Sequence, residues 1–179
     1  MKFGQKVGLI IGIIIVSVVI GGGLVMALDL KSFAFGNGEN IPRKHTGEGA
    51  DVSPALTWQG APERTKSFAL ICDDPDAPGG DWVHWVIYDI PAFLNELEEF
   101  TSPKPLFENG IKQGQNDFGR TGYRGPMPPP GKPHRYFFKL YALDNVLGLP
   151  KGISKDQLEK AMQGHILEEA YLIGLYNRK

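Results

Sequence analysis

Three segments of the chain are rich in the apolar, β-branched and aromatic residues that favour strands. Ser67 to Cys72 (SFALIC) is apolar at nearly every position, which predicts a central strand buried on both faces. Asp81 to Ile90 (DWVHWVIYDI) and His134 to Leu143 (HRYFFKLYAL) predict two further strands. Side chains alternate between the two faces of a strand, so His134 and Tyr136 share one face and can point into one cavity.

One helix is expected near the end of the chain. Ser154 followed by Gln157 fits a capping box, and Leu158 then opens an apolar helical face. We expect this helix to continue through His165 to Glu169, and Tyr171 to Tyr176 (YLIGLY) to form a last strand. Several strands with irregular connections and one late helix predict a mostly β fold, built as a largely antiparallel β-sandwich.

A long connection joins the second and third predicted strands. It runs from Pro91 to Pro133, and so long a loop inside a compact domain is more often functional than idle. Its last part, Gly125 to Pro133 (GPMPPPGKP), holds five prolines, which fix φ and remove backbone donors. We therefore expect a stiff loop that holds His134 in a fixed place.

The N-terminal part of the chain has a different pattern. Residues 7–28 carry no charge, which suits one helical crossing of a bilayer. Lys2 and Lys6 precede this segment and the next basic residue is Lys31, so the N-terminus is expected in the cytoplasm and the rest of the chain outside.

A cleaved signal peptide, followed by secretion, is the alternative for this segment. Val25 and Ala27 are small enough for a cleavage site, but the apolar stretch exceeds the roughly 7–15 residues usual in signal peptides. We favour the uncleaved anchor. Residues 1–28 are thus predicted to be a transmembrane anchor or signal peptide, and residues 29–179 one domain.

Composition narrows the functions open to this domain. Because Lys2 and Lys6 account for two of the 19 basic residues and all 20 acidic residues follow them, the remainder has a net charge of about −3. Without a basic run, nucleic acid is not an expected partner. Cys72 is the only cysteine, so no intrachain disulfide can form, and its apolar strand predicts a buried small hydrophobe.

Polar side chains gather where the predicted strands begin and end. Asp74 and Asp76 follow the first strand within a proline-rigid DPDAP turn, and His84 comes just after the next strand begins. A short turn joins these strands, so Asp74 and His84 should lie close together. Spacing alone does not tell whether His134 and Tyr136 share their cavity.

Each of these residues also has a purely structural interpretation. A single histidine at a strand end usually has structural partners, and the aspartates of a DPDAP turn can accept bonds from backbone N–H groups. Arg135 is expected to pair with a nearby acid, for which Asp76 is the candidate. The proline loop could be a rigid spacer.

Four motifs in order make the chain resemble a known family. The motifs are EGADVSPALTW (Glu48 to Trp58), DPDAP (Asp74 to Pro78), HW (His84 and Trp85) and GPMPPPGKPHRY (Gly125 to Tyr136). Together they resemble the phosphatidylethanolamine-binding protein family, in its prokaryotic Raf kinase inhibitor-like branch. The resemblance covers about Phe33 to Tyr176.

The resemblance implies a Greek-key β-sandwich of two antiparallel sheets with one or two peripheral helices. It also implies a small pocket at one end that accepts phosphate, acetate or phosphorylated headgroups. We expect neither a metal nor a cofactor. By motif position, the ligand-binding residues would be Asp74, His84, Pro128, His134 and Tyr136, with Asp76 in support.

Three functions follow as hypotheses. The first is a non-enzymatic binding module for a small anionic ligand, such as a phospholipid headgroup. The second is inhibition or modulation of an unidentified protein partner, a kinase or protease, through the pocket rim. The third is a hydrolase in which Asp74, Asp76, His84 and His134 bind a metal such as zinc and Tyr136 aids the transition state. Neither an HExxH nor a CxxC spacing supports the third.

Overall fold

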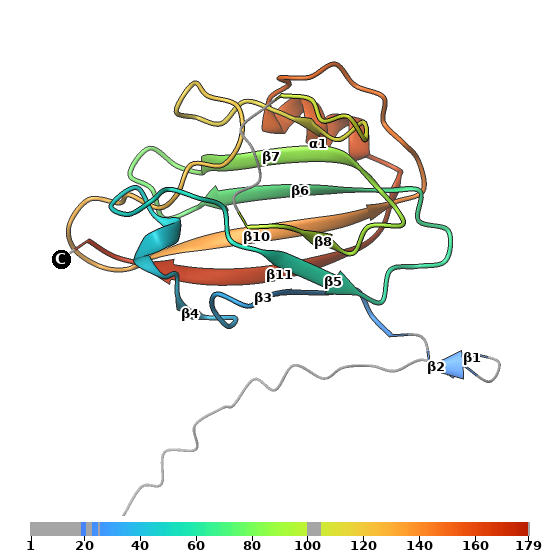
Figure 1. The fold of residues 1–179 in the computed structure, drawn as a ribbon, viewed down its shortest axis with the longest axis horizontal. Helices are drawn as coiled ribbons and strands as arrows, with labels where there is room; N and C mark the ends of the chain where they lie inside the picture. The colour runs from blue at the N-terminus through green and yellow to red at the C-terminus, as the bar shows by residue number, and fades with distance from the viewer. Residues whose placement is uncertain (1–18, 21–22, 25, 100–104, 179) are drawn as a thin grey trace, which may run out of the picture.

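In the part of the chain that the structure describes, the protein is mostly β, with one α-helix and one 3-10 turn (Figure 1). The computed structural model describes residues 19–20, 23–24, 26–99 and 105–178. In chain order its elements are β1 (Val19–Ile20), β2 (Gly23–Leu24), β3 (Asp29–Ser32), β4 (Glu39–Asn40), the 3-10 turn η1 (Arg43–His45), β5 (Leu56–Gln59), β6 (Ser67–Asp74), β7 (Trp82–Pro91), β8 (Glu96–Leu97), β9 (Lys112–Gln113), β10 (His134–Leu143), α1 (Lys155–Met162) and β11 (Ile166–Tyr176).

The main sheet has six strands in the order β4–β11–β10–β6–β7–β9. Its long strands lie side by side in Figure 1. All eight residues of β6 are buried, which confirms the predicted central strand. Its side chains alternate between two apolar clusters: Phe68 and Leu70 belong to one, Ala69 and Ile71 to the other. A strand covered on both faces needs apolar residues at every position, and this explains the sequence SFALIC.

Different elements cover the two faces of this sheet. On one face the three-stranded sheet β3–β5–β8 contributes Leu30, Leu56 and Trp58 to the cluster that includes Phe138. On the other face α1 contributes Leu158 and Met162 to a second cluster, with residues of β6 and β7. Both layers pack on the strands that end at the candidate site, which holds those strand ends in place.

The fold-class prediction is correct only as a mostly β fold with one helix. The main sheet is mixed, because β4 pairs with β11 in parallel. Its four long strands follow the order β11–β10–β6–β7, which sets two antiparallel pairs, β6–β7 and β10–β11, beside each other rather than in the 4-1-2-3 order of a Greek key. The predicted Greek-key order is therefore wrong, whereas the other strand pairs of the two layers are antiparallel, as expected.

Helix α1 begins as predicted and ends early. The Ser154 hydroxyl accepts a hydrogen bond from the Gln157 N–H, and the side-chain oxygen of Gln157 accepts one from the Ser154 N–H, so the capping box is confirmed. The expected extension through Glu169 is wrong, because α1 ends at Met162 and Gly164 adopts a φ of +80°. The following residues pair with β10 along the whole of β11, and these sheet bonds outweigh the helical period.

The fold-class prediction is also wrong in its N-terminal transmembrane helix. Within residues 7–28, β1 and β2 pair as short antiparallel strands. No helix in the described ranges is long and apolar enough to cross a membrane. Valine, isoleucine and glycine, which are frequent in this segment, are poor helix formers in water. Most of the predicted span, including residues 7–18, lies outside the described residues. The described residues do not test signal cleavage, a location outside the cytoplasm or the predicted domain boundary.

Candidate functional site

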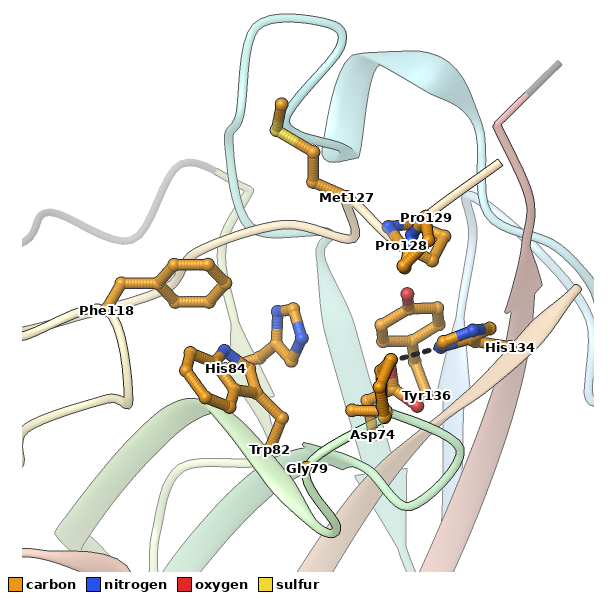
Figure 2. A pocket seen from close by; sticks show the side chains of 12 residues that line it. Asp74, Gly79, Trp82, His84, Phe118, Met127, Pro128, Pro129, His134 and Tyr136 are labelled. Atoms are coloured by element: carbon orange, nitrogen blue, oxygen red, sulfur yellow. Dashed lines mark hydrogen bonds and ion pairs between the residues drawn. The ribbon is translucent and has the colours of Figure 1, made fainter. Parts of the chain in front are cut away.

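A pocket of about 260 Å³ lies at the end of the main sheet where β6 ends and β7 and β10 begin. Figure 2 shows its side chains in place. The lining residues come from these strand ends, from the turn between β6 and β7 and from the connection between β9 and β10: Asp74, Ala77, Pro78, Gly79, Trp82, His84, Phe118, Met127, Pro128, Pro129, His134 and Tyr136. The structure therefore brings five of the six predicted site residues into one cavity, including the two pairs that spacing could not connect.

Asp74 and His134 meet because their strands are paired. Strand β10 runs antiparallel to β6, with Phe137 opposite Asp73, so the start of β10 lies beside the end of β6. The Asp74 Oδ2 atom accepts a hydrogen bond from Nδ1 of His134 at 2.8 Å. The other carboxylate oxygen accepts the backbone N–H of Asp76 at 2.9 Å. Asp74 is thus fixed in direction from two sides.

His84 occupies the opposite wall of the pocket. Its Nδ1 lies 2.5 Å from the carbonyl oxygen of Arg124, which can only accept, so Nδ1 carries the proton. Nε2 then bears a lone pair whenever the ring is neutral. Burial lowers the pKa of His84 from its ordinary value of 6.5, although the Arg124 carbonyl and Asp74 oppose this. The neutral ring packs edge-on against Tyr136 at 5.1 Å between centroids.

Tyr136 stands between the two histidines with its hydroxyl directed toward Pro128 and Pro129 (Figure 2). It is 1% exposed, and its hydroxyl has no hydrogen-bond partner in the part of the chain that the structure describes. Burial, followed by the charge of Asp74, raises the pKa of Tyr136, so the hydroxyl stays protonated at neutral pH. A buried donor without a partner is costly and rare in folded proteins.

The proline loop forms one wall of the pocket through Pro128 and Pro129. Its start is tied down by Asp51, which accepts the backbone N–H of Gly125 at 2.7 Å and a short bond from the Arg124 guanidinium. Asp51 adopts a φ of 57°, a conformation that aspartate tolerates better than most residues. The loop lacks regular secondary structure over most of its length, as its prolines predicted.

Asp76 is the one predicted site residue that does not line the pocket. It accepts bonds from the Arg135 guanidinium at 2.8 and 2.9 Å and from the Arg135 backbone N–H, which confirms the expected pairing. The hydrogen bond from Arg135 lowers the pKa of Asp76 to about 2. Asp76 supports the turn that carries Asp74. A ligand-binding role for the six residues stays a prediction.

Two aromatic residues of the pocket mouth, Trp82 and Phe118, were not identified from the sequence, whereas Met127 was expected as core or pocket wall. Trp82, Phe118 and Met127 line it and are 37%, 37% and 45% exposed. The Phe118 ring also packs edge-on against His84. The length of the connection from Pro91 to Pro133 was the only available signal for Phe118, and it did not identify the residue.

The metal site of the hydrolase hypothesis is not assembled. In the described ranges, no group of three or more His, Cys, Asp and Glu side chains is arranged to hold a metal ion. Asp74 is bonded to His134, and Asp76 is bonded to Arg135 outside the pocket. These four proposed ligands are thus not gathered around one point.

The two layers of sheet with a pocket at one end are typical of a β-rich binding module. Comparison with known proteins identifies the family of the chain. The family model for phosphatidylethanolamine-binding protein matches residues 31–177. The chain therefore belongs to the phosphatidylethanolamine-binding protein family, which confirms the resemblance seen in its motifs.

Relatives with high identity are found in archaea and bacteria. The UPF0098 protein of Methanothermobacter thermautotrophicus is 52% identical over 151 residues, covering 84% of this chain and 99% of the relative. The UPF0098 protein of Aquifex aeolicus is 54% identical over 160 residues, covering 88% and 91%.

Two crystal structures share the fold. YbcL of Escherichia coli, described as a member of the mammalian PEBP family, matches with a TM-score of 0.79 and 34% identity, over 86% of this chain and all of YbcL (100%). The PEBP homologue CT736 of Chlamydia trachomatis matches with a TM-score of 0.78 and 39% identity, over 86% and 99% of the two chains.

Proposed function

We propose that the chain is a non-enzymatic binding module whose pocket holds a small phosphorylated or carboxylated ligand, of the kind found in phospholipid headgroups. The observation that carries this proposal is the Tyr136 hydroxyl, a protonated donor that is buried in the pocket without a partner. A ligand oxygen placed against it would satisfy this donor and remove the cost of leaving it unpaired.

The charges around the pocket are compatible with an anion. In its protonated form His134 carries a positive charge beside the cavity, which Asp74 balances through the 2.8 Å bond. A bound anion could then contact both the protonated His134 ring and the Tyr136 hydroxyl. The name of the family, phosphatidylethanolamine-binding protein, supports a phosphorylated ligand.

The mouth of the pocket favours a ligand that also has an apolar part. Trp82, Phe118 and Met127 expose apolar surface there. A carbon chain attached to the anionic group would cover this surface, which contributes about 25 cal/mol per Å² removed from water. A phosphate ester fits both the polar interior and the apolar mouth.

Thermal unfolding of the full chain tests the proposal. Millimolar phosphate, phosphoethanolamine or acetate should raise the unfolding midpoint of the wild type, since a ligand that binds only the folded state stabilises it. Tyr136→Phe should lose this response, whereas Tyr171→Phe, a change at an exposed tyrosine of β11, should keep it. An unchanged midpoint of the wild type with all three compounds would exclude the proposed function.

Two other roles have no supporting contact among the described residues. One is the modulation of a kinase or protease partner through the pocket rim, and the other is metal-dependent hydrolysis. Both stay predictions from the sequence.

A further inference from the structure

The turn between β6 and β7 forms one side of the pocket, and few bonds of its own hold it. Ala77, Pro78 and Gly79 of this turn line the cavity. Gly79 and Trp82, the first residue of β7, lie on the same side of it (Figure 2). Among the described residues, the interior of the turn has one backbone bond, from the Gly80 N–H to the Ala77 carbonyl at 3.0 Å. Two adjacent glycines leave the backbone much freedom, so the position of this wall depends on what holds the two ends of the turn.

A first tether joins the start of the turn to β10. Asp76 accepts two hydrogen bonds from the Arg135 guanidinium. The two side chains are 30% and 53% exposed, and an ion pair this open to water contributes little to stability. This pair therefore does not by itself fix the far end of the turn, which lies next to Trp82.

A second tether joins the end of the turn to a buried ion pair. Lys155, the first residue of α1, is 12% exposed, and its ammonium group donates to both Asp73 and Asp81. Asp81 is the last residue before β7, whereas Asp73 lies in β6 with its side chain fully buried. The bond to Asp73 measures 2.7 Å and reaches the same carboxylate oxygen that accepts from Lys139. One ammonium group thus connects the turn to the main sheet and to α1.

This second tether lies behind the pocket wall and not inside the pocket. Side chains alternate at the start of β7, so Trp82 faces the pocket while Asp81 and Lys155 line a neighbouring cavity. Burial lowers the pKa of Lys155, whereas its hydrogen bonds to Asp73 and Asp81 raise it, and the net shift is upward. The ammonium group therefore keeps its charge, and both of its bonds, at neutral pH.

We propose that Lys155 is a positioning residue that holds the pocket wall in place by tying Asp81 to the buried Asp73. Lys155 is not among the described residues that line the pocket, so it acts through the turn. Without this tether, the turn and Trp82 should move more, and a cavity that is less preorganised binds its ligand more weakly. The inference rests on the proposed function where it concerns ligand affinity, and on the ligand-free protein where it concerns the order of the turn.

Two carboxylates beside Lys155 provide a matched comparison. Asp81 and Glu159 are both 43% exposed and lie near the same ammonium group, but only Asp81 belongs to the turn. In the full chain, hydrogen exchange of the Gly80 amide reports the order of the turn, because this amide is bonded within it. Asp81→Asn should speed the exchange by about tenfold, the effect of one hydrogen bond to a charged group. Glu159→Gln should leave it within about twofold of the wild type.

Titration with phosphoethanolamine measures the consequence for the pocket. Asp81→Asn should weaken binding by about threefold or more, as expected when one more group must be ordered on binding. The loss of a negative charge would by itself favour an anion, so weaker binding reports the wall and not the charge. Glu159→Gln should bind as the wild type does.

Substitutions of Lys155 itself give a second test. Lys155→Met should reproduce the faster Gly80 exchange and the weaker binding of Asp81→Asn, whereas Lys155→Arg, which keeps the charge and the donors, should restore both toward the wild type. If Lys155→Met fails to fold because Asp73 loses a partner, Asp81→Asn decides, since it keeps the bond between Lys155 and Asp73.

Equal Gly80 exchange in Asp81→Asn and Glu159→Gln would overturn the inference. Faster exchange in Asp81→Asn with unchanged affinity for phosphoethanolamine would also overturn it, because the turn would then not shape the pocket. If the wild type binds neither phosphoethanolamine, phosphate nor acetate, the proposed function fails. In that case the exchange comparison alone decides whether Lys155 orders the turn.

Discussion

The His134 imidazole and the Asp74 carboxylate form a hydrogen bond of 2.8 Å that joins the first residue of β10 to the last residue of β6. The pair is nearly buried, with 13% and 5% of the two side chains exposed. A second histidine–aspartate pair, which serves for comparison, lies just beyond the other end of β10, about 30 Å away along the strand. There His165 Nδ1 lies 2.8 Å from Asp144 Oδ1, with 41% and 37% of the side chains exposed.

Substituting Asp74 should destabilise the protein far more than substituting Asp144. Asp74→Asn removes the charge opposite His134 at a buried position, and we expect a loss of about 1–3 kcal/mol in the free energy of unfolding. Asp144→Asn affects an exposed pair and should cost less than about 0.5 kcal/mol. Urea titration at pH 6 measures both values. Equal losses for the two variants would show that burial does not strengthen the Asp74–His134 pair.

Removing the Tyr136 hydroxyl should separate stability from binding. Because this hydroxyl is buried without a partner, Tyr136→Phe should raise the free energy of unfolding of the ligand-free protein by about 1 kcal/mol. The same variant should bind phosphate about tenfold more weakly or worse, since the donor is lost. Chemical denaturation and calorimetry give the two quantities. A variant that loses stability and keeps its phosphate affinity would contradict both expectations.

The parts of the fold and site that could be predicted are those that depend on local pattern. The apolar run of β6 and the aromatic, β-branched sequences of β7 and β10 located the main strands, because burial on a pleated sheet selects such residues. The placement of Asp74 and His84 near one another followed from the short turn between their strands. The connection of this pair to His134 required the β6–β10 pairing, which strand spacing does not reveal.

The parts that could not be predicted depend on contacts between distant segments. The helical period after Met162 is overridden because residues from Ile166 onward pair with β10. Asp51 holds the start of the proline loop, yet its bond to Gly125 joins residues 74 positions apart. In the N-terminal segment, hydrophobicity alone did not distinguish a helix from the paired strands β1 and β2.

The stability of the ligand-free protein should depend on pH through His84. Burial lowers the pKa of His84 in the folded state below its ordinary value of 6.5, so the unfolded chain binds the proton more readily. The stabilisation by the neutral ring is fully present above about pH 6.5 and is lost as pH falls from there toward the folded-state pKa. In this window the free energy of unfolding should change by up to about 1.4 kcal/mol per pH unit.

Comparison of two histidine variants isolates this contribution. His84→Gln keeps a donor for the Arg124 carbonyl and cannot titrate, so the slope between pH 5 and 6.5 should become smaller. His165→Gln, at the exposed pair, serves as the control for general effects of removing a histidine. Urea midpoints measured across this range provide the slopes. An unchanged slope in His84→Gln would mean that the ring gains a proton as easily in the folded state as in the unfolded state.

The position of the proline loop should depend on the absence of a side chain at Gly125. A Cβ atom there would lie 2.4 Å from the carbonyl oxygen of His45, 2.7 Å from Thr46 Cα and 2.9 Å from Asp51 Oδ1. Two of these are backbone atoms, so the loop itself must move. Gly125→Ala should therefore destabilise the protein by about 1–3 kcal/mol and weaken phosphate binding as Pro128 and Pro129 shift.

Gly79 provides the matched control for Gly125. It lies in the turn on the opposite side of the pocket, and a Cβ there would meet no atom within 4 Å. Gly79→Ala should leave the free energy of unfolding within about 0.5 kcal/mol of the wild type. Urea unfolding of both variants, with phosphate titration of Gly125→Ala, makes the comparison. If Gly125→Ala matched Gly79→Ala in stability and the wild type in phosphate affinity, the loop would be free to shift without consequence, and the rigid wall that we infer from its prolines would be wrong.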